Sequence, residues 1–286
     1  MVMHKTRNFF LTVIGLIWAI IVLSPFYLVV VNSSKKAVDI TLNPFALPDG
    51  LGQFAENLSN VIGNPNFSFY SSLTWSALVT VVTLTLLILL SSMAAWVLCR
   101  NKTWWSSMLF MMFIATMIIP FQAVMLPLLT VFRTIQEITG IQMLQSFWGL
   151  IFAYMGFGAP LTIFVLHGFI KNIPFELEQS ASIDGCSPAG TFFRIIFPLL
   201  RPVQVTLLIL NGIWIWNDFL LPLIMLGLSG RVKTLPVAVQ SLYGTYIRQW
   251  DLILTAAFLA MIPAVTLFIF AQKYIIKGMV EGAIKG

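Results

Sequence analysis

Long apolar runs constrain this chain more than any other feature of its sequence. Six of them lie at residues 9–31, 73–98, 104–120, 147–170, 205–226 and 252–271, and only the fifth contains an Asp, Glu, Lys or Arg, namely Asp218. A helix of about 20 apolar residues crosses the hydrocarbon core of a bilayer. Strands of a membrane β-barrel are shorter and alternate in polarity, which these runs do not. The sequence therefore predicts an all-α membrane protein with about six transmembrane helices.

The composition agrees with a lipid environment. Hydrophobic residues make up 59% of the chain and charged residues only 9%, whereas soluble domains carry about 25% charged residues. The net charge is +6, but the lysines and arginines lie at the ends of the apolar runs and form no patch with interleaved aromatic residues. We interpret them as a membrane-topology signal, which excludes a nucleic-acid-binding protein.

The basic residues also predict the orientation of the chain. If the N-terminus is cytoplasmic, six spans place ten lysines and arginines on the cytoplasmic side and six on the other side. The positive-inside rule favours this arrangement, with both termini in the cytoplasm. Residues 32–70 then form the longest external loop, and we expect one transmembrane domain over residues 1–286.

The third apolar run ends at a proline and is followed by a second, shorter apolar stretch at residues 124–132. That stretch is too short to span the membrane, so we expect an interfacial or re-entrant segment. Pro120 interrupts the hydrogen bonds of the preceding helix, which leaves carbonyl groups for water or neighbouring groups to satisfy. Gln122, directly after this break, is a candidate for the transport pathway, although a simple helix kink explains it equally well.

Residues 171–202 are unusual among the polar intervals, because they predict two short helices joined by a turn. Pro174 suits the first position of a helix, and Gly185 suits the left-handed residue that ends it. Ser187 can cap a second helix with Pro188 at its first position, running to Pro198. From the residues alone, two interpretations stay open: an amphipathic elbow in the membrane interface, or a docking element for a cytoplasmic partner.

This interval resembles the cytoplasmic signature of the permeases of binding-protein-dependent ABC importers. The signature reads E-A-A, three residues, G, nine residues, I-x-L-P, and the chain has QSA at 179–181, Gly185 and IIFP at 195–198 with the same spacing. Three positions depart from it, with Gln for Glu, Ser for Ala and Phe for Leu. The segments MIIP at 117–120, WNDFLLP at 216–222 and GMVEGAIKG at 278–286 also resemble the sugar branch of this family, particularly its MalG-like half.

The resemblance implies that the interval is a coupling helix between spans four and five, which contacts an ATPase. The residues to which it assigns this role are Glu178, Gln179, Ser180, Ala181, Asp184, Gly185, Ile195 and Pro198. Gln179 replaces the glutamate of the signature and keeps only a neutral hydrogen bond. The neighbouring Glu178 is a candidate substitute for that glutamate.

The resemblance also implies partners and a location. They are a second permease subunit, expected to be a different chain, two nucleotide-binding ATPase subunits and an extracytoplasmic solute-binding protein, in the bacterial cytoplasmic membrane. The sequence contains no GxxxxGK[ST] phosphate loop, so we expect ATP and Mg²⁺ on the ATPase and no cofactor on this chain. The chain is then a non-catalytic subunit that moves a mono- or oligosaccharide.

Asp218 is the most unusual residue within an apolar run. An acidic side chain at the centre of a bilayer costs about 2.5–3.5 kcal/mol on insertion scales, so it should face protein or water. One interpretation places it in the substrate pathway with Gln122, Trp214 and Asn217. The other is structural, a hydrogen bond that caps a broken helix near Pro222.

Two other classes of membrane protein compete with the importer interpretation. A gradient-driven secondary transporter often places charges and broken helices at the midplane of the membrane, and a passive channel or assembly scaffold needs no ATPase. Neither class requires the 171–202 sequence, which therefore favours the importer.

Overall fold

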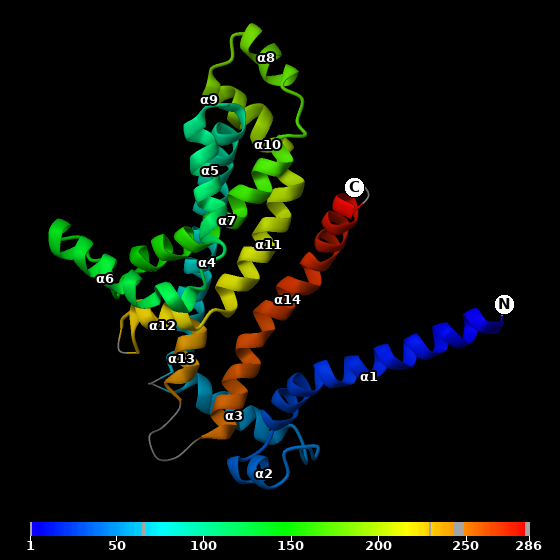
Figure 1. Cartoon of the computed structure of the whole chain (residues 1–286). Coiled ribbons are helices and arrows are strands. Elements are labelled where there is room, and N and C mark those ends of the chain that lie inside the picture. The colour runs from blue at the N-terminus through cyan, green and yellow to red at the C-terminus, as the bar shows by residue number, and fades with distance from the viewer. Residues whose placement is uncertain (1, 65–66, 229, 243–248, 284–286) are drawn as a thin grey trace. The chain divides into compact units, whose positions relative to one another are not determined.

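A computed structural model describes residues 2–64, 67–228, 230–242 and 249–283, and every regular element in these ranges is helical (Figure 1). The elements are α1 (Val2–Asn32), α2 (Ala37–Leu42), α3 (Gly52–Ile62), α4 (Phe69–Arg100), α5 (Trp104–Thr116), α6 (Phe121–Thr139), α7 (Phe147–Ile170), α8 (Glu176–Ile183), α9 (Pro188–Thr191), the π-helix η1 (Phe192–Ile196), α10 (Phe197–Leu199), α11 (Arg201–Asn217), α12 (Leu220–Leu226), α13 (Leu235–Gln240) and α14 (Trp250–Ala283). The all-helical class predicted from the sequence is confirmed for the described residues.

Three helices are long and apolar enough to cross a membrane, namely α1 from Phe9 onward, α4 and α7. Two bent pairs raise the number to as many as five, because α5 and α6 meet at 112° and the Pro188–Leu199 segment meets α11 at 72°. The apolar part of α14, Trp250–Thr266, is shorter. Long apolar helices are therefore confirmed, while six spans and the cytoplasmic position of the termini stay predictions.

The structure changes two of the predicted segments. The stretch expected at 124–132 belongs to a longer helix, α6, which begins directly after Pro120 and continues through Pro127. The fifth apolar run is not one helix, because α11 ends at Asn217, Asp218 takes an extended conformation with ψ 130°, and α12 begins at Leu220. Hydropathy cannot register such a break, since the residues on both sides are apolar.

Contacts divide the chain into two compact units. The first comprises Met1–Tyr70 and Ala238–Pro263, and the second comprises Ser71–Val237 and Ala264–Gly286. The single domain expected from the sequence stays a prediction. The second unit holds nearly all of α4 and continues to α12, and the first holds α1, the predicted external loop with α2 and α3, and the start of α14.

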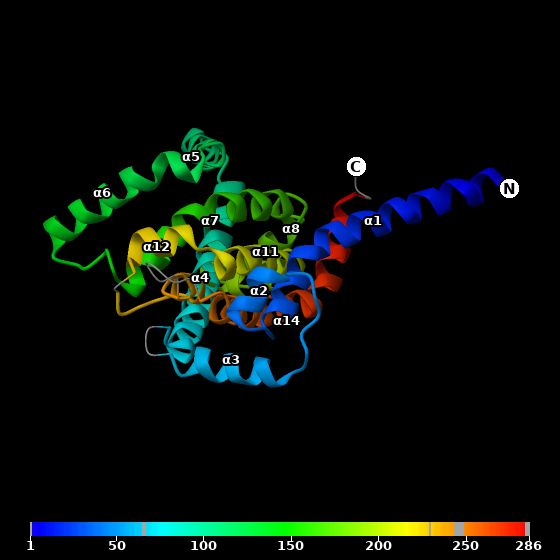
Figure 2. The ribbon, with the colours of Figure 1, turned by 90° about the horizontal axis from the view of Figure 1, so that it is seen from below.

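The second unit has two apolar clusters along its long helices. One surrounds Tyr154 and Leu226, and the other surrounds Leu166, Ile196 and Leu200, all of them nearly inaccessible. In the two views of Figures 1 and 2, α6 projects sideways from this unit, and Figure 1 places α8 to α10 at one end of α4, α7 and α11. The second cluster therefore forms the base on which α8 to α10 rest.

Polar side chains join the packed helices of the second unit. The Asn211 amide of α11 donates to Thr162 Oγ1 of α7 at 3.3 Å, and Gln204 donates to Ser92 Oγ of α4 at 3.4 Å. A Cβ added at Gly158 would lie 2.9 Å from Leu87 Cδ2, so this glycine permits a close approach of α7 to α4. Small residues and interhelical hydrogen bonds are the usual means by which helices associate in lipid.

In the first unit, the predicted external loop is a folded cap and not an irregular segment. The Asn57 amide of α3 donates to the carbonyl oxygens of Ser33 and Lys35 at 3.0 and 2.9 Å, and Thr255 Oγ1 of α14 donates to the same Ser33 oxygen at 3.0 Å. Phe54 of α3 packs edge-to-face on Phe258 of α14. These contacts fix α3 and α14 to the end of α1.

Most side chains of α1 from Phe9 to Val30 are exposed and apolar. A contiguous apolar surface of this size is unfavourable in water and favourable in lipid or against another apolar helix. The exposure of α1 therefore agrees with a membrane-embedded chain.

Candidate functional site

The elbow predicted at residues 171–202 contains a short helix that ends at a left-handed glycine. Gly185 has φ +80°, the Cys186 N–H donates to Ala181 O at 2.9 Å, and the Gly185 N–H donates to Ser182 O at 3.1 Å. This pair of hydrogen bonds is the Schellman motif, which satisfies carbonyl groups at a helix end. The predicted role of Gly185 is confirmed, but α8 begins at Glu176 with Phe175 as its cap, so Pro174 lies outside the helix.

The second half of the elbow begins as the sequence predicts and then departs from a regular helix. Ser187 Oγ accepts from the Gly190 N–H at 3.1 Å, and Pro188 occupies the first turn of α9. The chain then widens into the π-helix η1 before Pro198. Pro198 has no N–H to donate, and its ring would collide with the carbonyl group four residues earlier. Widening to a π turn is a common way to accommodate such a conflict inside a helix.

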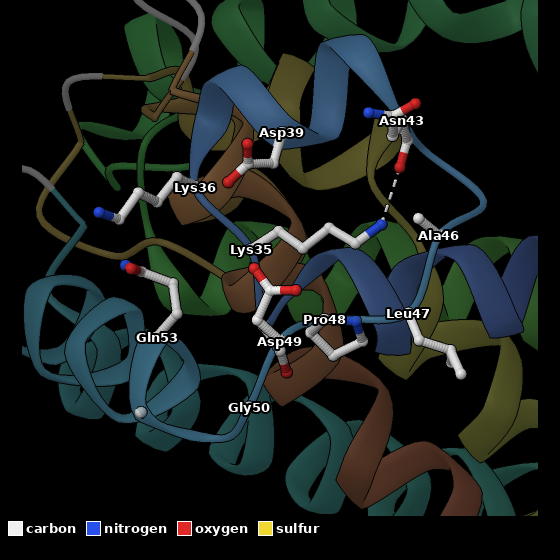
Figure 3. A pocket seen from close by; sticks show the side chains of 12 residues that line it. Lys35, Lys36, Asp39, Asn43, Ala46, Leu47, Pro48, Asp49, Gly50 and Gln53 are labelled. Carbon is white, nitrogen blue, oxygen red and sulfur yellow. Dashed lines mark hydrogen bonds between the residues drawn. The ribbon is translucent and has the colours of Figure 1, made fainter.

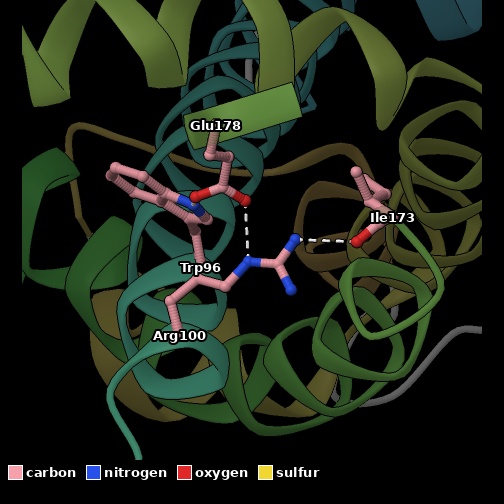
Figure 4. Close-up of polar contacts among 4 residues, drawn as sticks. All are labelled: Trp96, Arg100, Ile173 and Glu178. Atoms are coloured by element: carbon pink, nitrogen blue, oxygen red, sulfur yellow. Dashed lines mark hydrogen bonds and ion pairs between the residues drawn. The ribbon is translucent and has the colours of Figure 1, made fainter. Parts of the chain in front are cut away.

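The inner edge of α8 is fastened to the end of α4 by a charged contact (Figure 4). Arg100 Nε donates to Glu178 Oε1 at 2.7 Å, and Trp96 Nε1 donates to Glu178 Oε2 at 3.0 Å. Arg100 Nη2 also donates to Ile173 O at 2.9 Å, and its guanidinium lies 5.5 Å from the centroid of the Phe175 ring. The Glu178 side chain is only 8% exposed, so both of its oxygens are engaged within the chain.

The side chains of this contact pack against the second apolar cluster. Trp96 packs against Phe192 of η1 with ring centroids 5.4 Å apart, and Ala181, one turn after Glu178, is buried. Phe192 and Ile196 are buried on the same side. The elbow is therefore held by a charge-assisted pair and by apolar packing at once, and both couple it to α4.

The outer edge of α8 is exposed and mixed in character. Gln179, Ser180 and Asp184 are exposed polar residues on this edge, and Ile183 is 86% exposed. Phe175 and Leu177 add partly exposed apolar surface. This edge of α8 therefore presents an exposed isoleucine among exposed polar residues.

The structure thus separates the eight predicted coupling residues into groups. Glu178 and Ala181 face inward, and Gln179, Ser180, Asp184 and Gly185 lie on the exposed side of α8. Ile195 is half-buried in η1, and Pro198 is exposed in α10. Glu178, the candidate substitute for the signature glutamate, has its carboxylate turned toward the body of the chain.

A second polar site lies at the break between α11 and α12. Tyr154 Oη donates to Asp218 Oδ2 at 3.1 Å, and Asp218 Oδ1 accepts from the Leu220 N–H at 3.1 Å. Tyr154 is inaccessible and contacts Trp214 edge-to-face with centroids 5.4 Å apart. The Asp218 carboxylate therefore holds a backbone N–H at the start of α12, in agreement with the structural interpretation, and its place in the substrate pathway stays a prediction.

The other predicted pathway residues lie at exposed positions. The Trp214 side chain is 38% exposed. The Asn217 amide donates to Ile213 O of its own helix, at 2.8 Å. Gln122 is exposed in the first turn of α6 and forms no hydrogen bond with any residue that the structure describes. The structure joins Trp214 and Asp218 through Tyr154, and no contact joins Gln122 to them within the described ranges.

Sequence reasoning missed three residues of these sites, namely Trp96, Arg100 and Tyr154. Arg100 counted only as a topology signal, and Trp96 and Tyr154 lie within apolar runs where aromatic residues are expected. A tyrosine in the middle of an apolar run carries a hydroxyl that needs a partner when buried. That requirement is the one signal that could have pointed to Tyr154.

Comparison with known proteins gives consistent results. Residues 87–281 match the sequence model of the family described as "Binding-protein-dependent transport system inner membrane component". The probable starch degradation products transport system permease protein AmyC of Thermoanaerobacterium thermosulfurigenes is 35% identical over 98% of this chain and 97% of its own length. The melibiose/raffinose/stachyose import permease protein MelC of Bacillus subtilis is 33% identical over 99% of this chain and all of its own length.

A solved structure shares the fold. It is a bacterial ABC transporter involved in the import of the acidic polysaccharide alginate, with a TM-score of 0.75 at 16% identity over 94% of this chain and 96% of that chain. At this level of identity the similarity establishes the fold alone.

Proposed function

Because the chain belongs to the family of binding-protein-dependent transport system inner membrane components, we propose that it is the permease subunit of an importer for a mono- or oligosaccharide. Relatives that align over nearly their whole length are named as permeases for starch degradation products, for multiple sugars and for melibiose, raffinose and stachyose. These names support a neutral sugar as the substrate class. They differ among themselves, so the individual sugar is a matter for measurement.

The exposed edge of α8 is the observation that carries the mechanism. A helix held on its inner edge by the Arg100–Glu178 pair and by apolar packing, with Ile183 exposed on its outer edge, is built to receive a partner and to pass its movement to α4. Closure of two ATPase subunits on ATP would displace α8, and the attached helices would switch the pathway between inward-open and outward-open. Such coupling requires a rigid two-state element that both sites bias.

The residues of the elbow then have different roles. Gln179, Ser180, Asp184 and Gly185 contribute to the surface for the ATPase, together with Ile183. Glu178 and Ala181 anchor the helix, and Ile195 and Pro198 connect it to α11. ATP and Mg²⁺ bind to the ATPase subunits, so this chain is a non-catalytic subunit without a cofactor of its own.

Membership in this family also suggests which subunits assemble with the chain. We propose a different permease chain as partner, two ATPase subunits and an extracytoplasmic solute-binding protein, in the cytoplasmic membrane of a bacterium. This chain would cross that membrane six times as a single permease domain with both termini inside. Trp214, Asn217 and Gln122 are the candidates for contact with the sugar, and Asp218 holds the helix break beside them.

Co-purification tests this proposal directly. The tagged chain, extracted in mild detergent, should bring down a nucleotide-binding ATPase and a second permease, identified by mass spectrometry. Ile183→Asp should lower ATPase recovery at least about tenfold, because it places a charge in the centre of an apolar contact. Ile138→Asp is the matched control, since Ile138 is 79% exposed at the end of α6 and would lie on the external side.

The opposite results would favour a different class of transporter. A chain that purifies intact and alone, with uptake that continues without ATP and stops when the ion gradient collapses, would indicate a gradient-driven transporter or channel subunit. Equal loss of ATPase in the two variants would remove Ile183 from the docking surface.

A further inference from the structure

The folded cap of the first unit contains a pocket that the coupling and pathway residues do not use (Figure 3). It has a volume of about 450 Å³ and lies between the end of α1, α2 and the start of α3. Small-molecule sites occupy about 300–1,000 Å³. The size therefore suits a ligand of two or three sugar rings more closely than a single ion.

The floor of the pocket is rigid because of Lys35. This lysine is 5% exposed, and its ammonium donates to Asn32 Oδ1 at 3.0 Å, Asn43 O at 2.9 Å and Pro44 O at 3.4 Å. These three acceptors use its three donors. The backbone of Lys35 is in turn held by Asn57 of α3. The wall formed by residues 43–44 is thus fixed to the end of α1 before any ligand arrives.

The charged groups that face the pocket are exposed, chemically mixed and accessible to a ligand. Lys36, Asp39 and Asp49 line it (Figure 3), and none of their side chains forms a hydrogen bond or ion pair with the residues that the structure describes. The Gln53 amide nitrogen donates to Asn57 Oδ1 at 3.0 Å, which leaves Gln53 Oε1 to accept from a ligand. The pocket therefore offers one strong donor and three acceptors.

The charged residues that line the pocket indicate which class of ligand it can bind. Lys35 and Lys36 balance Asp39 and Asp49, so a charged ligand gains no net attraction. A sugar hydroxyl both donates and accepts, and neighbouring hydroxyls can therefore use carboxylates, an ammonium and an amide oxygen at once. Hydrogen bonds to charged partners are also the stronger ones. We propose that this pocket binds the end of a neutral oligosaccharide on the external side of the membrane.

The proposal rests on the function proposed above, since an external sugar site serves an importer that receives its sugar from outside. It adds a site on this chain that is separate from Trp214 and Asn217.

Binding of neutral trisaccharides to the full-length chain in nanodiscs tests the pocket. Saturation-transfer difference NMR with maltotriose and with raffinose should detect at least one of them, and a triguluronate of the same size should give no signal. The double variant Asp39→Asn/Asp49→Asn should weaken binding by about tenfold or more, because it removes two charged acceptors. Glu56→Gln is the matched control, since Glu56 lies exposed on α3 outside the pocket.

Lys36→Gln gives a second variant at an exposed position, in case the double variant unfolds, and it should also weaken binding. Absence of signal for both trisaccharides would overturn the proposal, and so would equal binding by the pocket variants and Glu56→Gln. Variants that reduce attachment of the solute-binding protein but leave sugar binding unchanged would overturn it as well. Failure of the ATPase to co-purify would instead contradict the proposed function, so the two failures are separable.

Discussion

At the scale of single residues, two acidic side chains within or beside apolar segments have structural tasks. Glu178 uses both carboxylate oxygens on Arg100 and Trp96, and Asp218 uses both on Tyr154 and the start of α12. Charges in such places are stable only when they are paired or hydrogen-bonded. Each therefore marks a point where the backbone changes direction and needs a fixed partner.

The Glu178 contact leads to a prediction about coupling. Glu178→Gln keeps the shape of the side chain but removes the charge opposite Arg100, so the attachment of α8 should weaken by about 1–3 kcal/mol. We expect faster amide hydrogen exchange in residues 176–186 and a lower ratio of sugar uptake to ATP hydrolysis in the reconstituted transporter.

Glu176→Gln is the control for this prediction, because Glu176 is an exposed residue in the first turn of the same helix. In a double-mutant cycle with Arg100→Gln, the double variant should lose much less stability of α8 attachment than the sum of the two single variants, because both remove the same interaction. Unchanged exchange in Glu178→Gln, or additive losses in the cycle, would contradict the anchoring role.

At the scale of elements, the elbow is a short helix with two defined ends rather than a flexible loop. Its end at Gly185 closes with the Schellman pair of hydrogen bonds, and the next helix begins at the Ser187 cap. The π turn before Pro198 then sets the direction in which the chain enters α11. Short helices with fixed ends transmit displacement, which is what a coupling element requires.

Replacement of Gly185 at the turn should leave the chain folded but abolish the coupling of ATP hydrolysis to uptake. Gly185 has φ +80° with no atom within 4 Å of an added Cβ, so Gly185→Val meets backbone strain of about 1–2 kcal/mol without a collision. We expect a folded chain at normal yield whose ATP hydrolysis no longer drives uptake. Parallel assays of the two rates in proteoliposomes would measure this separation.

Gly168→Val is the control for the turn, because Gly168 is a helical residue near the end of α7 that also has open space around it. It should keep the normal ratio of uptake to hydrolysis. Normal coupling in Gly185→Val would show that the geometry of this turn is dispensable.

At the scale of the whole molecule, the function depends on which elements lie on which side of the membrane. The proposed importer needs α8 in the cytoplasm and the cap with α2 and α3 outside. The distribution of Lys and Arg favours this orientation. Both native cysteines, Cys99 and Cys186, are free, so a reporter thiol can replace them.

Labelling from outside intact cells should reveal this orientation. With both native cysteines changed to serine, Glu56→Cys on α3 should react with a membrane-impermeant maleimide. Ser182→Cys on α8 should react only after the cells are permeabilised. Both positions are exposed, so lack of reaction would reflect the membrane barrier. Reaction of Ser182→Cys in intact cells would invert the topology and contradict the docking of a cytoplasmic ATPase.

The sequence by itself determined the class of fold, the family and the local signals of the elbow. Apolar runs without charges require helices in lipid, because backbone groups there must be satisfied within the segment. The glycine and the serine–proline pair of the elbow are local rules, since a left-handed turn and a helix cap depend on neighbouring residues only. That is why Gly185 and Ser187 were predicted correctly.

The tertiary structure alone decided which side chains meet. Arg100 and Glu178 are 78 residues apart in sequence, and Tyr154 and Asp218 are 64 apart. No periodicity or motif reports such pairs, because they depend on how helices pack. The sequence left a broken helix near Pro222 open, but only the tertiary structure shows that Asp218 at this break is bound by Tyr154 of another helix. The pocket of the cap likewise exists only because α3 and the end of α1 are fixed together.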